Sequence, residues 1–349
     1  MSKMSTSDCH NLKVVPYSGE KRQDWDDFVK NHSRNHTIFH EQRFLSYHGD
    51  RFRDCSVLIC DQKNGSILAV CPAALNEGSG QVGVVSHPGS TYGGIIYRDE
   101  LKTKALKKIV DIIIKHYFTI YGAKFIKFIL PEEFPTGNSI GDLTFLLWHR
   151  GFELASKEAS TVIDLKNINS YPNFRKTTKQ YIKSKKDERL GISHHLGETE
   201  AEINMAYALI KNNLNAKYQK DPTHSLEEIF RLKRLYKKEI KVFYSIFEER
   251  LIGTVIIFEL NNEVVHTFYI SQDYNYARVN PLTGLFMLIF SHYAEKGFKF
   301  FNFGISSRGK WIKWGILDFK EQFGGRLLTR DTWILRDLSG EWPFDGALS

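Results

Sequence analysis

Apolar and polar residues in the first half of the chain alternate in short β-rich runs and in one long helical pattern. Two runs flank Asn64-Gly65, a dipeptide typical of two-residue hairpin turns. The helical pattern ends at Gly122, a residue type common just after a helix. These signals predict a hairpin, a third strand, a helix and a fourth strand. In order, they occupy residues 55–60, 66–75, 81–86, 102–121 and 124–130.

The second half of the chain repeats this order. Two strands meet across Glu249-Arg250, a third strand follows, and Pro281 suits the first turn of a helix that Gly297 closes. The two halves also share a sequence motif, because His-Tyr and then Gly-x-Lys-Phe-x-x-Phe occur at 116–128 and at 292–303. We interpret the chain as a duplicated unit. The repeated elements are expected at 241–248, 251–259, 263–271, 281–296 and 299–303.

The region between the repeats predicts three helices and a short strand. A basic helix is expected over 171–189, where Arg175, Lys179 and Lys183 share one face, as they also would in an ordinary solvated helix. Ser225 and Glu228 have capping-box spacing, which makes Ser225 structural rather than catalytic. The remaining elements are a strand at 191–196 and helices at 201–213 and 225–237.

Alternating strands and helices are typical of an α/β fold, and 349 residues allow two domains. We place the boundary near Leu165. The predicted domains are therefore residues 1–165 and 166–349.

Composition narrows the classes of function. The N-terminus is polar, and no run approaches the roughly 18 apolar residues that cross a bilayer, so we expect a cytoplasmic protein without a membrane span. The four cysteines lack C-x-x-C spacing, so no metal is expected. A net charge of +8 suits an anionic partner such as a nucleotide, coenzyme A or tRNA. The sequence does not specify an oligomeric state.

The doubled order of elements resembles two GNAT domains, and residues 319–325 (FKEQFGG) resemble the F-K-x-x-F-G signature of Fem peptidyltransferases. A closer resemblance is to Fem-like sugar N-acyltransferases of envelope polysaccharide pathways. It rests on four motifs, at 39–40, 86–94, 222–228 and 303–306.

The resemblance implies two tandem GNAT-like domains, each a mixed, mostly antiparallel sheet flanked by helices. It also implies transfer of an acyl group, such as acetyl or 3-hydroxybutanoyl, from a coenzyme A thioester. The implied acceptor is the amino group of a dTDP-linked amino-dideoxy hexose used for O-antigen or capsule.

The loop at 273–284 departs from the usual GNAT loop R/Q-x-x-G-x-G/A, because its only glycine is Gly284. Amides at the start of the following helix can still bind a pyrophosphate. The residues expected to contact the cofactor are Ile270, Ser271, Arg278 and Gly284.

Acyl transfer to an amine needs stabilisation of an oxyanion and a route for the proton. Backbone amides at 269–271 lie where GNAT-like proteins place the oxyanion hole. His266 and His224 are candidate bases because histidine titrates near neutrality. Asp273 and Glu321 are alternatives. Both His266 and Glu321 also have a structural interpretation. His266 can be a core residue, and Glu321 can form an ion pair with Lys320 or Arg326.

The loop 86–94 (SHPGSTYGG) carries three glycines and a proline, and its backbone can approach a ligand closely. Tyr92 can stack on a thymine or a sugar. A tight connection after a strand explains the loop equally well. The residues expected to bind substrate are His87, Gly89, Thr91, Tyr92, Gly93, Lys217, Tyr218, Tyr269 and Lys320.

Two other functions fit the sequence. A Fem-type aminoacyltransferase would take its acyl group from aminoacyl-tRNA for a cell-wall precursor, with the basic helix along a phosphate backbone. A noncatalytic nucleic-acid-binding module would rest on charge alone, without a motif that reads bases. We expect acyl-CoA and a nucleotide-linked amino sugar as partners, no DNA, and tRNA only under the first alternative.

Overall fold

The computed structural model describes residues 11–134, 139–166, 187 and 189–336. The chain divides into two compact units, which we call unit 1 (Met1–Lys157 with Arg330–Ser349) and unit 2 (Glu158–Thr329). The last segment of the chain thus belongs to unit 1, whereas the predicted domains 1–165 and 166–349 are contiguous. No helix in the described ranges is long and apolar enough to cross a membrane.

The first sheet of unit 1 is antiparallel and has four strands in the order β1-β2-β3-β6. Its hairpin β2–β3 turns through Asn64-Gly65, as predicted. Side chains alternate across the sheet: Val57 and Ile59 join the core around helix α3, while Leu58 packs with Trp25 of α1. The elements are β1 (Leu12–Pro16), α1 (Arg22–His32), β2 (Val57–Asp61), β3 (Ile67–Cys71), β6 (Ile96–Tyr97) and α3 (Thr103–Tyr121).

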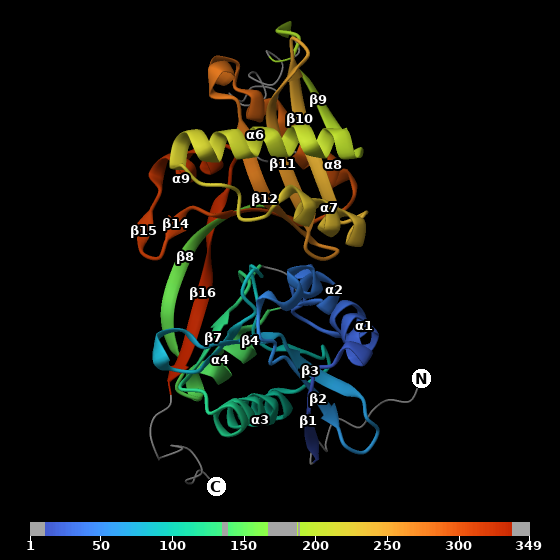
Figure 1. Cartoon of the computed structure of the whole chain (residues 1–349), viewed down its shortest axis with the longest axis vertical. Helices are drawn as coiled ribbons and strands as arrows, with labels where there is room; N and C mark the ends of the chain where they lie inside the picture. Colours follow the sequence, from blue (N-terminus) through green and yellow to red (C-terminus); the bar gives the residue numbers. More distant parts are fainter. Residues whose placement is uncertain (1–10, 135–138, 167–186, 188, 337–349) are drawn as a thin grey trace. The chain divides into compact units, whose positions relative to one another are not determined.

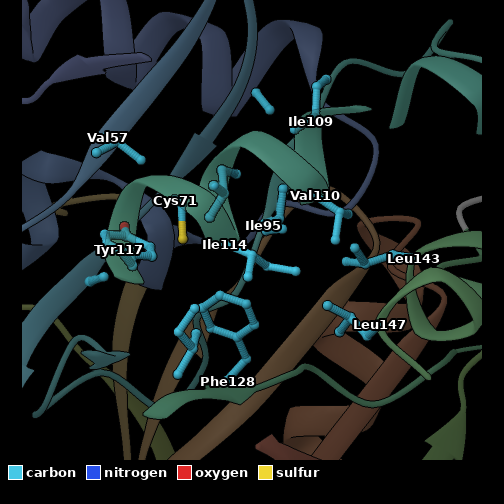
Figure 2. Packing of buried hydrophobic residues seen from close by; sticks show 14 of the residues in the cluster. Val57, Cys71, Ile95, Ile109, Val110, Ile114, Tyr117, Phe128, Leu143 and Leu147 are labelled. Carbon is cyan, nitrogen blue, oxygen red and sulfur yellow. The ribbon is translucent and has the colours of Figure 1, made fainter. Parts of the chain in front are cut away.

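Helix α3 carries the main core of unit 1. Its buried residues follow helical spacing, so they form one stripe against the sheet. Figure 2 shows Val110, Ile114 and Tyr117 of this stripe together with Phe128 and Leu147. Gly122 ends the helix with φ of 59°, a left-handed conformation that glycine adopts without steric cost. The predicted helix is therefore confirmed.

The other strands of unit 1 pair in the order β4-β5-β7-β16. They are β4 (Ala73–Asn76), β5 (Gly83–Ser86), β7 (Phe125–Ile129) and β16 (Arg326–Arg336), and helix α4 (Gly141–His149) follows β7. The short helices are η1 (Gly19–Lys21), η2 (Ile38–His40), α2 (Gln42–Leu45), η3 (Ser46–Arg51) and η4 (Gly78–Gly80).

Unit 2 contains a mixed sheet in the order β8-β13-β12-β11-β10-β9. Helix α6 crosses one face of β10, β11 and β12 (Figure 1), and α8 packs on the other face. The strands are β8 (Glu153–Asp164), β9 (Ser193–Gly197), β10 (Ile240–Phe247), β11 (Arg250–Glu259), β12 (Val264–Gln272) and β13 (Phe300–Ile305). The helices are α6 (Glu200–Tyr218), α7 (Leu226–Leu235), η7 (Tyr274–Val279), α8 (Pro281–Glu295) and α9 (Trp314–Glu321).

The predicted strands and helices of the second half are confirmed, each within a few residues. Ser225 caps α7 and forms the predicted capping box with Glu228. A two-stranded hairpin, β14 (Ser307–Arg308) with β15 (Trp311–Ile312), was not predicted. The predicted basic helix at 171–189, with Arg175, Lys179 and Lys183, lies almost entirely outside the described residues.

The duplication is visible in the strand register. In unit 1, β5 pairs in parallel with β7 through Val84↔Ile126, and α3 connects them. In unit 2, β12 pairs in parallel with β13 through Val265↔Phe301, and α8 connects them. Ile126 and Phe301 are the same position of the Gly-x-Lys-Phe-x-x-Phe repeat, so both halves form one strand–helix–strand unit.

The final strand of each repeat pairs in the other unit. Strand β8 follows α4, and its residues 160–164 pair antiparallel with β13 of unit 2. Strand β16 follows α9, and its residues 332–336 pair antiparallel with β7 of unit 1. Asp164 pairs with Phe300 and Arg336 with Phe125, the same position in each repeat. The two repeats therefore exchange strands in one register.

This exchange makes the C-terminal strand part of the core of unit 1. Leu335 is 5% exposed and joins the core around α3, whereas Leu327 of the same strand is 45% exposed. Leu335→Ala should lower the free energy of unfolding by about 2–5 kcal/mol, because it leaves a cavity. Leu327→Ala should stay within about 0.5 kcal/mol of the parent in the same denaturant titration. Equal effects of the two substitutions would contradict the assignment.

Candidate functional site

Strands β12 and β13 of unit 2 pair for only three residue pairs, from Val264↔Phe300 to His266↔Asn302. Beyond His266, β12 continues to Gln272 and remains paired with β11 on its other edge. Strand β13 instead stays with β8, through Ile305↔Ser160. The facing edge of β12 over residues 267–272 can therefore hydrogen-bond to an extended ligand, as sheet edges do.

A β-bulge in β12 places two aromatic side chains on one face. The register passes from Ile256↔Tyr269 to Ile257↔Thr267, so Phe268 is the extra residue. Phe268 and Tyr269 both contact the ring of His224, at centroid distances of 4.7 and 6.1 Å. Ile270 points to the other face and packs in the core with α8.

His224 and Tyr269, which were predicted separately, are in direct contact. The His224 Nδ1 atom lies 3.0 Å from the Tyr269 hydroxyl, which also accepts a hydrogen bond from the His224 backbone N–H at 3.3 Å. Burial raises the pKa of Tyr269, so its phenol stays protonated at neutral pH. The pair can therefore supply and relay a proton beside the open edge of β12.

Backbone polar groups at the end of β13 are satisfied by side chains. The Asn302 Oδ1 atom accepts hydrogen bonds from the Ser160 hydroxyl at 3.0 Å and from the Gly304 N–H at 2.7 Å. Lys320, 3% exposed, donates to the carbonyl oxygens of Gly304 and Ile305 at 2.7 and 2.9 Å. These contacts replace the strand pairing that ends at Asn302.

This arrangement changes the interpretation of two predicted residues. Lys320 was expected to bind a substrate anion, but its ammonium group holds backbone carbonyls of the site. His266 is 7% exposed and lies against Gly304, whose added Cβ would be 3.1 Å from the His266 Cε1 atom. Both side chains thus meet at Gly304, which has φ of 73°. They position the end of β13.

The start of helix α8 is occupied by a carboxylate of the chain itself. Asp187, 2% exposed, accepts a hydrogen bond from the Gly284 N–H at 3.2 Å. His194 lies 3.7 Å from the same Asp187 oxygen through Nε2, and 2.9 Å from the Ser245 hydroxyl through Nδ1. A Cβ on Gly284 would come within 2.1 Å of His194. The amide expected to face a cofactor phosphate therefore faces Asp187.

Other predicted residues of unit 2 have different surroundings. The Ser271 hydroxyl accepts a hydrogen bond from Asn213 of α6 at 2.6 Å, and Asp273 caps η7 by accepting from the Asn275 N–H. Lys217 lies 3.5 Å from the Tyr274 hydroxyl. Arg278 and Glu321 are exposed, and the side chain of Tyr218 lies outside the described part. Among the described residues, no hydrogen bond joins Asp273, Arg278 or Glu321 to Tyr269.

The predicted substrate loop of unit 1 packs tightly into its own unit. His87 is 5% exposed and stacks on His48, and burial lowers its pKa. Tyr92 is 1% exposed and its hydroxyl donates to Glu132 at 2.6 Å, which differs from the expected stacking on a base. Thr91 is half-buried.

Glycine is required at two positions of this loop for packing. A Cβ on Gly89 would lie 2.1 Å from the His48 ring, and one on Gly93 would lie 2.5 Å from the Ser86 hydroxyl. The third glycine of the loop, Gly94, has φ of 96°, and a Cβ there would lie 2.5 Å from the Leu130 Cδ2 atom. This conformation therefore supports a tight connection after β5.

Asn302, Asp187 and Ser160 were missed by the sequence analysis. Asn302 carried a signal, because it is the one polar residue in the apolar run 300–303. Asp187 carried none, since it stands among basic residues. In the part of the chain that the structure describes, no group of three or more His, Cys, Asp or Glu side chains is placed to hold a metal ion.

A family model matches the part of the chain that contains β12 and β13. Residues 172–321 match the family model described as an acetyltransferase (GNAT) domain. A search of curated protein sequences finds no match.

The fold extends over nearly the whole chain of three solved structures. The crystal structure of FemX has a TM-score of 0.68 at 11% identity, covering 93% of this chain and 97% of FemX. The structure of L-PGS from Bacillus licheniformis has a TM-score of 0.59 at 14% identity, covering 92% and 93%. A conserved protein of unknown function from Bacteroides thetaiotaomicron has a TM-score of 0.57 at 11% identity, covering 93% and 100%.

The duplicated α/β units with a diverging strand pair define the class as a tandem GNAT, Fem-like fold. Residues 172–321 carry its acetyltransferase (GNAT) domain. Residues 172–321 therefore match an acetyltransferase domain, and nearly the whole chain shares the fold of FemX.

Lys320 should contribute to stability because it satisfies two buried carbonyl groups. Lys320→Met should lower the free energy of unfolding by about 1–3 kcal/mol. Lys313→Met, at an exposed position, should change it by less than about 0.5 kcal/mol. Chemical denaturation measures both. Loss of activity in Lys320→Met at unchanged stability would instead indicate a direct contact with substrate.

Proposed function

We propose that the protein is an N-acyltransferase that moves an acyl group from a coenzyme A thioester to the amino group of a dTDP-linked amino-dideoxy hexose. The observation that carries acyl transfer is the open edge of β12, which lies inside the segment matching a GNAT domain. The sugar acceptor is supported by the resemblance of the motifs at 86–94, 222–228 and 303–306 to sugar N-acyltransferases.

The chemistry follows from the groups along this edge. The acyl carbonyl oxygen accepts hydrogen bonds from β12 amides within 267–272, which stabilise the oxyanion. The acceptor nitrogen forms the new C–N bond and the C–S bond breaks. Tyr269 gives its proton to the departing sulfur, because its raised pKa keeps it protonated, and the proton lost from the ammonium nitrogen of the tetrahedral intermediate restores it. His224 holds the phenol in place.

A second candidate, transfer from aminoacyl-tRNA, is favoured by a specific observation. The carboxylate of Asp187 takes the Gly284 amide at the start of α8, where an anion would bind a helix N-terminus. A coenzyme pyrophosphate must therefore lie elsewhere, with the pantetheine arm along β12 as the main anchor. An aminoacyl ester has no pyrophosphate and avoids this constraint.

Thiol release in the presence of a panel of acyl-CoA donors and dTDP-linked amino sugars tests the proposal. Acceptor-dependent release, with the expected gain in product mass, supports the sugar N-acyltransferase. Release that needs another amine acceptor keeps the thioester donor and overturns the sugar. Transfer from charged tRNA with no release from any thioester overturns the donor.

The proton-donor role of Tyr269 has a matched control. Tyr269→Phe should lower kcat about a hundredfold, in the range of lost general acid catalysis, with KM for the acceptor unchanged. Tyr274→Phe removes the same hydroxyl from a side chain that is 55% exposed and should leave kcat within about twofold. Equal rates for parent and Tyr269→Phe, at equal melting temperature, would remove Tyr269 from the mechanism.

A further inference from the structure

Unit 2 exposes a concentrated set of large apolar side chains at residues 305–316. Trp311 and Trp314 are 73% and 64% exposed. Between and beside them, three isoleucines are 37–38% exposed, namely Ile305, Ile312 and Ile316. They lie at the end of β13, in the hairpin β14–β15 and in the first turn of α9. Such a gathering of exposed apolar groups marks an interaction surface.

The same segment is basic. Arg308, Lys310 and Lys313 are exposed, and no acidic residue occurs between 305 and 317. Among the residues that the structure describes, none of these three cations forms an ion pair, and Lys310 lies 5.6 Å above the Trp311 ring. Aromatic and aliphatic groups thus alternate with uncompensated positive charge. We call residues 305–316 the Trp–Lys surface.

Charge and side-chain type together favour an anionic bilayer as the partner. Tryptophan prefers the boundary between hydrocarbon and lipid headgroups, and lysine and arginine keep their charge among anionic headgroups while their stems lie on apolar surface. The isoleucines gain by entering hydrocarbon but cannot stack on bases as ligands of single-stranded nucleic acid do. A symmetric contact between two copies would bring like charges together.

We propose that the Trp–Lys surface docks unit 2 on the surface of an anionic lipid bilayer. The surface adjoins the candidate site, because the Ile305 carbonyl oxygen is one of the two acceptors held by Lys320. Docking goes beyond the proposed acyl transfer and does not depend on it, since vesicle binding needs neither donor nor acceptor.

Sedimentation of the full-length protein with vesicles tests the proposal. Vesicles of phosphatidylcholine with about 30% phosphatidylglycerol should carry the protein to the pellet, and vesicles of phosphatidylcholine alone should leave it in solution. Lipids brominated along their chains should quench tryptophan fluorescence of the bound parent. A parent protein that stays in solution with the anionic vesicles would refute the proposal.

Variants locate the contact. Trp311→Ser with Trp314→Ser should weaken partitioning about tenfold or more, and should abolish the quenching. Arg308→Gln, Lys310→Gln and Lys313→Gln together should weaken it about a hundredfold, at roughly fivefold per cation. All five positions are side chains at the surface, and melting temperatures check that each variant folds.

Matched controls lie in unit 1. Trp148, 63% exposed on α4, serves for the tryptophans, and exposed Lys30, Lys102 and Lys104 serve for the cations. Trp148→Ser and the control glutamine triple should bind within about threefold of the parent. Controls that lose binding as much as the test variants would indicate nonspecific attraction and refute the docking surface. The docking surface would also be refuted if the Trp–Lys variants still bound vesicles but no longer bound a single-stranded oligonucleotide. The same holds if they still bound vesicles but no longer self-associated.

Discussion

The rest of the site depends on how β13 leaves β12 without losing hydrogen bonds. A buried backbone group without a partner is costly, so strands that separate need other partners. Here Asn302 accepts from the Gly304 N–H, Lys320 takes the carbonyls of Gly304 and Ile305, and Thr267 donates to the Phe303 carbonyl at 2.9 Å. Side chains thus replace the missing strand and leave the edge of β12 for a ligand.

The exchange of final strands gives this arrangement its frame. Strand β8 comes from the first repeat and supplies Ser160 to Asn302, while β16 from the second repeat completes the sheet around β7. Each compact unit therefore needs both halves of the sequence. A contiguous division of the chain describes neither unit, because a strand would be missing from each.

Local signals made much of the fold predictable from the sequence. The helical stripe of α3, Gly122 after it, and the Asn64-Gly65 turn each act within a few residues, and the structure confirms them. The repeated sequence motif at 116–128 and 292–303 also predicted equivalent strand–helix–strand units. The exchange of β8 and β16 was not predictable, because strand partners far apart in sequence leave no periodic signal.

The candidate site was predictable only in part, because residue types can be read from the sequence but contacts between distant residues cannot. His224 and Tyr269 are residue types suited to proton transfer, but their contact depends on the bulge at Phe268 and on tertiary packing. The motif at 319–325 led to the prediction that Lys320 binds a substrate anion. In the structure Lys320 is buried and donates hydrogen bonds to backbone carbonyl groups. Tyr92 and the glycines of its loop are explained by packing within unit 1.

A coenzyme A thioester and an aminoacyl-tRNA differ in whether they need a pyrophosphate site at the start of α8. Asp187 places a negative charge where a GNAT-like loop would otherwise offer amides to a pyrophosphate. A thioester donor must then be held chiefly along β12. The position at which the donor binds therefore separates the two chemistries.

Hydrogen–deuterium exchange of the full chain, with and without a nonhydrolysable analogue of acetyl-CoA, tests this claim most directly. The account predicts slower exchange of the backbone amides at 267–272 when the analogue binds, because the ligand pairs with the open edge of β12. Binding of the analogue with unchanged exchange in this segment would contradict it.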